Sequence, residues 1–73
     1  MGQVTQEMIE SVFSNPKFRK KFIHPRKDKA ICEMRLAGGL YADIAKKYGV
    51  STFYCREVIR RAVRIYTVFM SSS

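Results

Sequence analysis

Residues 41–60 constrain the fold of this chain more than any other stretch. They read as two short helices that meet at Gly49, because glycine most readily takes the positive φ with which a chain leaves a helix. Ala45, in the first of these helices, is small enough to let two crossing helices approach closely. Ser51 follows the turn and predicts an N-cap for the second helix. Apolar residues fill the positions that a third, supporting helix would bury, namely Ile44, Tyr48, Val50, Cys55 and Val58.

Two short helices are expected ahead of this stretch. The first covers residues 5–13, because apolar residues recur there at intervals of three and four and Thr5 can cap the start. The second covers residues 16–23, since Asn15 is a good cap and Pro16 suits the first helical position. Its two phenylalanines, four residues apart, are expected to face inward. Residues 1–25 are thus predicted to be an N-terminal helical extension that packs on the rest.

Residues 26–70 are expected to form the core of a single domain that covers residues 1–73. A helix over residues 26–37 should end at the Gly38 and Gly39 pair, with an inner face made of Ala30, Ile31, Met34 and Ala37. Leu40 stands where a capping residue is usual, so Asp43 is expected to support the next helix through its dipole. After Ser51 the apolar pattern continues to about residue 69, which predicts a long final helix. Residues 71–73 are expected to fray.

The composition limits the class of protein. At 73 residues the chain is near the lower size limit for an unaided core, and its 47% apolar content excludes global disorder. No apolar run could span a bilayer and the first eight residues do not resemble a secretion signal, so we expect a cytoplasmic protein. Cys32 and Cys55 fall at apolar helical positions and are expected to be free thiols in the core. A single histidine, His24, cannot complete a four-ligand zinc site, and no cofactor is expected.

Positive charge dominates the polar residues. The net charge is +8, from 14 basic and 6 acidic residues, and the pI is near 9.9. Residues 1–15 hold no base, whereas residues 16–29 hold seven bases against Asp28 alone. A surplus of this size on so small a domain indicates a polyanionic partner. The alternative is a solvated basic surface that only keeps the protein soluble.

Residues 41–60 resemble the helix-turn-helix DNA-binding family, in particular the three-helix type of resolvases, transposases and region 4 of sigma factors. The resemblance rests on the joint register of Ala45, Gly49, Ser51 and the apolar positions, and it covers about residues 27–64. It implies a small all-α bundle with a helix-turn-helix core, whose second motif helix enters the DNA major groove. The function it implies is sequence-specific binding of double-stranded DNA by a small transcriptional regulator or accessory factor, which would suit a bacterial or phage setting.

The resemblance also implies which side chains would read the bases. They are Thr52, Phe53, Arg56, Glu57 and Arg60. Arginine can donate twice to guanine, a phenylalanine ring or threonine methyl can contact the thymine methyl, and glutamate can accept from cytosine. Two alternatives stay open. Glu57 would form an ordinary surface ion pair with Arg61, four residues later, and Phe53 would fold back on the neighbouring helix.

A second set of residues is expected to contact DNA phosphates. It comprises Lys46, Lys47, Ser51, Arg64, Lys27 and Lys29. The other bases of residues 17–29 would add a further strip or a flexible arm along the groove. Binding that depends on so many phosphate contacts should weaken steeply with salt.

Other classes of function have less support. The acidic residues, Asp28 among them, are expected on helix surfaces without an enclosed pair, so we do not expect an enzyme. RNA-binding strand patterns are absent, and the arginines that would suit a membrane surface are explained by the motif. The main alternative is a protein-interaction module on the same scaffold, in which Phe53 and Tyr54 contact RNA polymerase or another regulator. A homodimer through the first helix or the chain end, with Ile65, Val68 and Phe69, is a further hypothesis.

Overall fold

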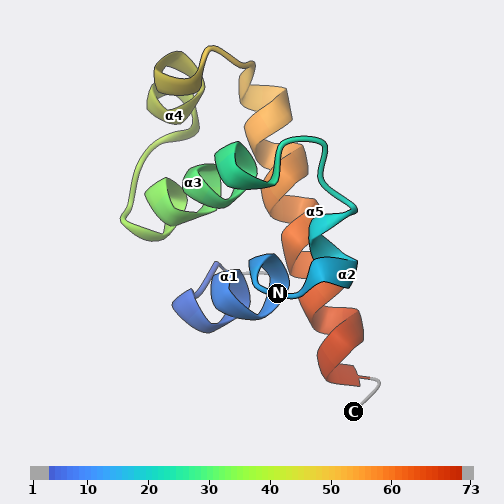
Figure 1. Ribbon diagram of the computed structural model, residues 1–73. Helices are drawn as coiled ribbons and strands as arrows, with labels where there is room; N and C mark the ends of the chain where they lie inside the picture. The colour runs from blue at the N-terminus through green and yellow to red at the C-terminus, as the bar shows by residue number, and fades with distance from the viewer. Residues whose placement is uncertain (1–3, 72–73) are drawn as a thin grey trace.

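The structure, a computed structural model, describes residues 4–71. Five helices make up this part of the chain and no strand occurs in it, so the predicted all-α fold is confirmed (Figure 1). The helices are α1 (Gln6–Phe13), α2 (Pro16–Arg19), α3 (Pro25–Leu36), α4 (Tyr41–Tyr48) and α5 (Thr52–Ser71). Within residues 4–71, none of the helices has both the length and the hydropathy that crossing a bilayer requires.

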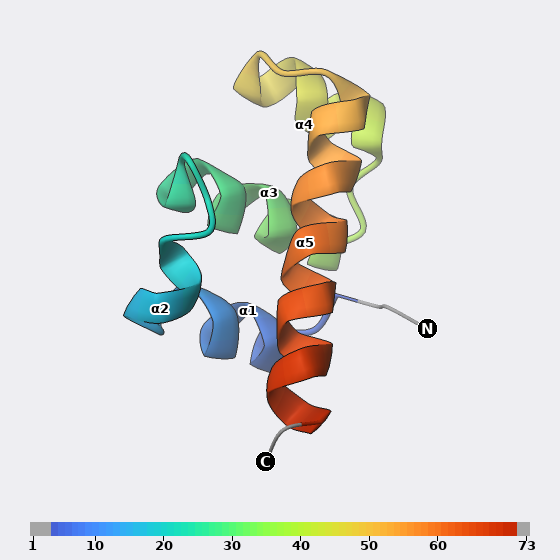
Figure 2. The same ribbon diagram turned by 90° about the vertical axis from the view of Figure 1, so that its right-hand side faces the viewer.

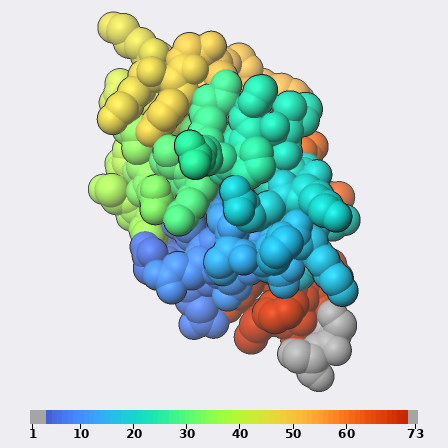
Figure 3. Space-filling model, viewed as in Figure 1, coloured from blue at the N-terminus to red at the C-terminus, as the bar shows by residue number. Residues whose placement is uncertain are grey.

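α5 is the helix on which the others are arranged. Its 20 residues span about 30 Å, which is most of the 37 Å long axis of the molecule. α1, α3 and α4 pack against it, and in Figure 3 the first four helices cover most of it. After a 90° turn, α5 is the nearest element and no other helix crosses in front of it (Figure 2). One face of α5 therefore contacts the core, and the opposite face is open.

Side-chain caps fix the starts of three helices where the sequence predicts them. Thr5 Oγ1 accepts from the Met8 N–H at 3.1 Å, and Asn15 Oδ1 accepts from the Lys17 N–H at 2.9 Å. Ser51 Oγ accepts from the Tyr54 N–H at 3.0 Å. Each bond satisfies an amide that has no partner within its own helix. These three capping predictions are confirmed.

The junction between α4 and α5 has the predicted tight corner. α4 ends at Tyr48, and Gly49 takes the left-handed conformation with φ 65° and ψ 36°, where a side chain would be strained. The Val50 N–H then donates to the Ala45 carbonyl at 3.0 Å. Ala45 itself is 6% exposed, as expected for a small residue between crossing helices. Leu40 gives α4 no side-chain cap, which also agrees with the prediction.

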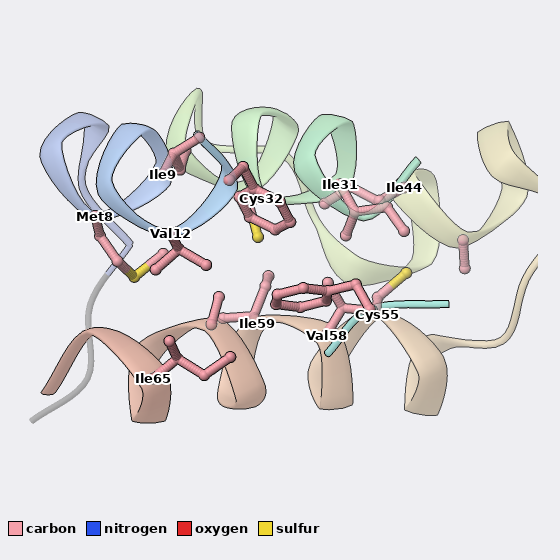
Figure 4. Close-up of a cluster of buried hydrophobic side chains, with 14 residues drawn as sticks. Met8, Ile9, Val12, Ile31, Cys32, Ile44, Cys55, Val58, Ile59 and Ile65 are labelled. Atoms are coloured by element: carbon pink, nitrogen blue, oxygen red, sulfur yellow. The ribbon is translucent and has the colours of Figure 1, made fainter. Parts of the chain in front are cut away.

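The core lies between α5 and the helices packed on it (Figure 4). Its fully buried members come from α1, α3, α4 and α5 and include Ile9, Ile31, Ile44 and Ala62. Cys32 and Cys55 are buried there as free thiols, as predicted. Burial, with Asp28 and Glu33 nearby, raises the pKa of Cys32 to about 12, so this thiol stays protonated at neutral pH.

α2 and α5 end at other places than predicted. α2 stops at Arg19 rather than near residue 23, because the chain turns at residues 20–21 and brings Phe22 into the core. There the Phe22 ring lies against Phe13, with 4.7 Å between ring centroids, whereas Phe18 is only half-buried. α5 continues through Ser71. The other two residues of the predicted frayed end, 72 and 73, lie outside the described residues.

α3 turns a different face inward from the predicted one. Its buried residues are Asp28, Ile31 and Cys32. Of the predicted inner residues only Ile31 is buried, while Ala30 and Met34 are half-buried and Ala37 is exposed. The predicted face left out Asp28 because a charged side chain is rarely buried without a partner. That partner is Tyr54 of α5, which the sequence pattern could not supply.

Candidate nucleic-acid interface

The open face of α5 carries the side chains that the sequence predicts to read DNA bases. We define the outer face of α5 as Thr52, Phe53, Arg56, Glu57, Arg60 and Arg64. Phe53 is 68% exposed and does not fold back on the neighbouring helix. The Arg60 side chain is 70% exposed, and Arg56 and Arg64 are also exposed. All five predicted base-reading residues therefore lie on one accessible side of α5.

Three arginines of this face surround one hollow. Arg56, Arg60 and Arg64 follow one another at intervals of four residues, which places them on successive turns about 6 Å apart. With Tyr41, Ile59 and Val63 they line a hollow of about 380 Å³. Like charges at this spacing repel one another, so a bound anion would stabilise the arrangement. The hollow has the chemistry of a site for phosphate or for the acceptor edge of a base.

Tyr41 joins two arginines at one edge of the outer face. The guanidinium carbon of Arg35 lies 4.5 Å from the centroid of the Tyr41 ring, and that of Arg56 lies 6.0 Å from it. Arg35 also donates from Nη1 to the Gly39 carbonyl at 2.9 Å. These contacts hold Arg56 beside the hollow without neutralising its charge. Sequence reasoning missed Arg35 and Tyr41, because their contact depends on how α3, α4 and α5 meet.

At the opposite edge, Tyr54 ties α5 to α3. Its hydroxyl donates to Asp28 Oδ1 at 2.7 Å, and Asp28 is 2% exposed. Burial and this hydrogen bond raise the pKa of Tyr54 to about 12. The prediction that Asp28 lies on a helix surface is therefore wrong. Tyr54, which the protein-interaction alternative places on a contact surface with Phe53, is half-buried. The Lys27 ammonium lies 5.5 Å from the Tyr54 ring, so this predicted phosphate contact sits at the edge of the outer face.

The alternative in which Glu57 pairs with Arg61 is not the one that the structure shows. Glu57 Oε2 lies 3.8 Å from Nη1 of Arg60 instead. Arg61 points toward α2, where its Nη1 donates to the Lys21 carbonyl at 3.0 Å and its guanidinium lies 6.0 Å from the Phe22 ring. The carbonyl is available because α2 stops early. The N-terminal extension thus binds the Arg61 side chain but does not cover the outer face.

The remaining predicted phosphate contacts are spread over three elements. Lys46 and Lys47 are exposed near the end of α4, and the Lys47 ammonium lies 5.9 Å from the Tyr48 ring. Ser51 is exposed at the corner, with its oxygen accepting from the Tyr54 N–H. Lys29 is exposed on α3. Ser51 therefore lies at the start of α5 and Arg64 about 20 Å farther along the helix, while the lysines lie on the neighbouring helices α3 and α4.

Metal-binding groups do not gather in the part of the chain that the structure describes. Among residues 4–71, no group of three or more His, Cys, Asp or Glu side chains is placed to hold a metal ion.

Comparisons of the chain with protein-family models, with curated proteins and with solved structures found no match. The functional argument therefore depends on the geometry of the outer face of α5 and on the chemistry of its residues.

Proposed function

We propose that the protein binds double-stranded DNA by placing the outer face of α5 in the major groove. The observation that carries the proposal is the exposed row of Arg56, Arg60 and Arg64 around one hollow. The net charge of +8 gives the whole chain an attraction to the DNA backbone. The major groove, about 12 Å wide, admits an α-helix. This arrangement agrees with the helix-turn-helix resemblance of residues 41–60.

Side chains at the start of α5 would read base edges. Arg56, held beside Tyr41, would donate to guanine, and the exposed Phe53 or the methyl of Thr52 would contact a thymine methyl. Glu57 would accept from cytosine, and Arg60 would reach a base one turn farther along. The pair between Glu57 and Arg60 is long and open to solvent. Separating it therefore costs little, about 0 to 1 kcal/mol.

Contacts to phosphates would set the position of α5 in the groove. Arg64 continues the row of arginines, while Lys46, Lys47 and Ser51 flank the corner that precedes α5. Lys27 and Lys29 would reach the backbone from α3. The biological role that follows is a cytoplasmic transcriptional regulator or accessory DNA-binding factor, acting alone or as a homodimer.

Fluorescence anisotropy with a random-sequence duplex at several salt concentrations tests the proposal. If five or six phosphates are neutralised, log K should fall against log salt with a slope of about −5. Selection from a random duplex pool should then enrich one motif. Binding that does not change with salt contradicts DNA binding, and a steep slope without enrichment contradicts base reading.

A second candidate is a protein-interaction module that targets RNA polymerase or another regulator. The observation that favours it is Phe53, an aromatic ring that is 68% exposed, since exposed aromatic anchors are common at protein interfaces. Arg56→Ala distinguishes the two candidates. It should weaken binding to a selected DNA site by about 1 to 3 kcal/mol more than binding to random DNA, and it should have no such effect if DNA is not the partner.

A further inference from the structure

A separate apolar groove lies between α2 and the second half of α5. Its volume is about 430 Å³, and its apolar lining consists of Phe18, Ile65, Val68 and Phe69. The Phe18 and Phe69 rings meet edge to face with 5.5 Å between centroids. Ile65 is 9% exposed, whereas Val68 is 60% exposed. The groove therefore offers an apolar surface that reaches from the core to the outside of the molecule.

Among the residues that the structure describes, every other one that lines this groove is basic. These residues are Lys21, Arg61 and Arg64. Arg61 is held in place, because its Nη1 donates to the Lys21 carbonyl at 3.0 Å and its guanidinium lies 6.0 Å from the Phe22 ring. Its positive charge is thus fixed at the edge of the groove. An apolar floor with a basic rim, of which Arg61 is held in place, selects an occupant that is both apolar and negatively charged.

We infer that the groove binds an acidic segment of a partner protein. One or two bulky apolar side chains of that segment fill the space beside Phe18 and Ile65, and its carboxylates pair with Lys21, Arg61 and Arg64. Apolar anchors in a pocket, ringed by complementary charge, are the usual source of affinity at such sites. The inference does not rest on DNA binding, because Arg64 is the one residue that this described lining shares with the outer face of α5.

Charge also decides between this occupant and two others. A second copy of the chain would bring two basic rims together, and each copy carries a net charge of +8, so repulsion would oppose that contact. A DNA backbone could pair with the rim, but the apolar floor offers its phosphates no hydrogen-bond donor. A segment with glutamate or aspartate around leucine or phenylalanine satisfies both parts of the groove.

A synthetic peptide tests the inference with the 73-residue chain. The probe is a fluorescein-labelled helical peptide of about 14 residues, with leucine and phenylalanine along one side and glutamate elsewhere. We expect saturable binding by anisotropy, and NMR shift changes centred on Phe18, Ile65 and Val68. A peptide with lysine in place of glutamate, and one with serine in place of the apolar residues, should each bind at least about tenfold more weakly.

Matched substitutions assign the binding to the groove. Val68→Asp and Lys21→Glu should each lower the affinity for the acidic peptide by about tenfold or more. Met70→Asp, at a residue that is 50% exposed, and Lys17→Glu make the same changes away from the groove lining, and they should change affinity less than about threefold. Circular dichroism melts check that all four variants fold.

Three results would overturn the inference. The first is equal weakening by the groove variants and their controls. The second is equal binding of the serine peptide, which would mean that charge alone attracts it. The third is a doubled mass in sedimentation that Val68→Asp abolishes and the peptide does not compete away, since the groove would then hold a second copy.

Discussion

The inner and outer faces of α5 belong to one helix but differ in burial and in charge. Cys55, Val58, Ile59 and Ala62 lie on the inner face and are 0% to 7% exposed. The outer face carries three exposed arginines and an exposed phenylalanine. Packing explains the inner residues, because they belong to the core cluster on the side of α5 against which α1, α3 and α4 pack. It does not explain the outer row, which suggests that the outer residues serve a partner rather than the fold.

The largest loss of stability is expected from a substitution on the inner face. Ile59→Ala should lower the free energy of unfolding by about 2 to 5 kcal/mol, because it removes buried methylene groups and leaves a cavity. The total free energy of unfolding of a native protein is only roughly 5 to 15 kcal/mol. Arg60→Ala, the adjacent outer residue, is the control and should change stability by less than about 0.5 kcal/mol. Urea unfolding measures both, and equal losses would erase the distinction between the two faces.

Alkaline pH should weaken the core while the outer face keeps its charge. The folded state raises the pKa of Cys32 from 9.0 to about 12 and that of Tyr54 from 10.0 to about 12. The contribution of these two groups to folding stability is complete below pH 9. It is lost as the pH rises toward 12, because the unfolded chain releases these protons at lower pH than the folded chain. Arginine stays protonated throughout this range.

Thermal melts at pH 7, 9 and 11 check this prediction. The melting temperature should fall most between pH 9 and pH 11. Cys32→Ala starts from a lower stability because it leaves a small cavity, but its melting temperature should fall less over the same interval. An identical fall in the two proteins would exclude Cys32 as a cause.

A smaller effect is expected at the boundary between the faces. Tyr54→Phe removes the hydrogen bond to the buried Asp28 carboxylate and should cost about 1 to 3 kcal/mol. The matched control is Tyr66→Phe, since the Tyr66 hydroxyl donates to Glu7 in an exposed pair. That change should cost less than the loss of the Tyr54 hydrogen bond, because solvent screens an exposed pair. Equal losses of stability in the two variants, measured by chemical denaturation, would mean that burial of Asp28 does not strengthen its hydrogen bond with Tyr54.

Features that depend on near neighbours in the sequence could be predicted. The caps at Thr5, Asn15 and Ser51 each join groups two or three residues apart. The bounds of α4 and the conformation of Gly49 follow from the same local chemistry. The inner face of α5 was also predictable, because a continuous apolar stripe at helical spacing leaves only one way to bury it.

Contacts between distant residues could not be predicted in the same way. Asp28 and Tyr54 are 26 positions apart, and Arg61 and Lys21 are 40 apart. Both pairings depend on how α5 crosses the earlier helices, and sequence spacing does not give that angle. The contact of Tyr41 with Arg35 and Arg56 has the same origin. The side chains of the candidate interface were thus predicted from the sequence, whereas the contacts that orient them required the structure.

The central claim, that the outer face of α5 binds double-stranded DNA, is tested most directly by two variants with the same net charge. One replaces Arg56, Arg60 and Arg64 with glutamine, and the other replaces Lys17, Arg19 and Lys20 on and beside α2. Anisotropy with a selected duplex, at one salt concentration, compares their affinities after circular dichroism has shown both to be folded. The account predicts a loss of at least about a hundredfold for the first variant and less than about tenfold for the second. Equal losses would contradict it, because net charge rather than the outer face would then determine binding.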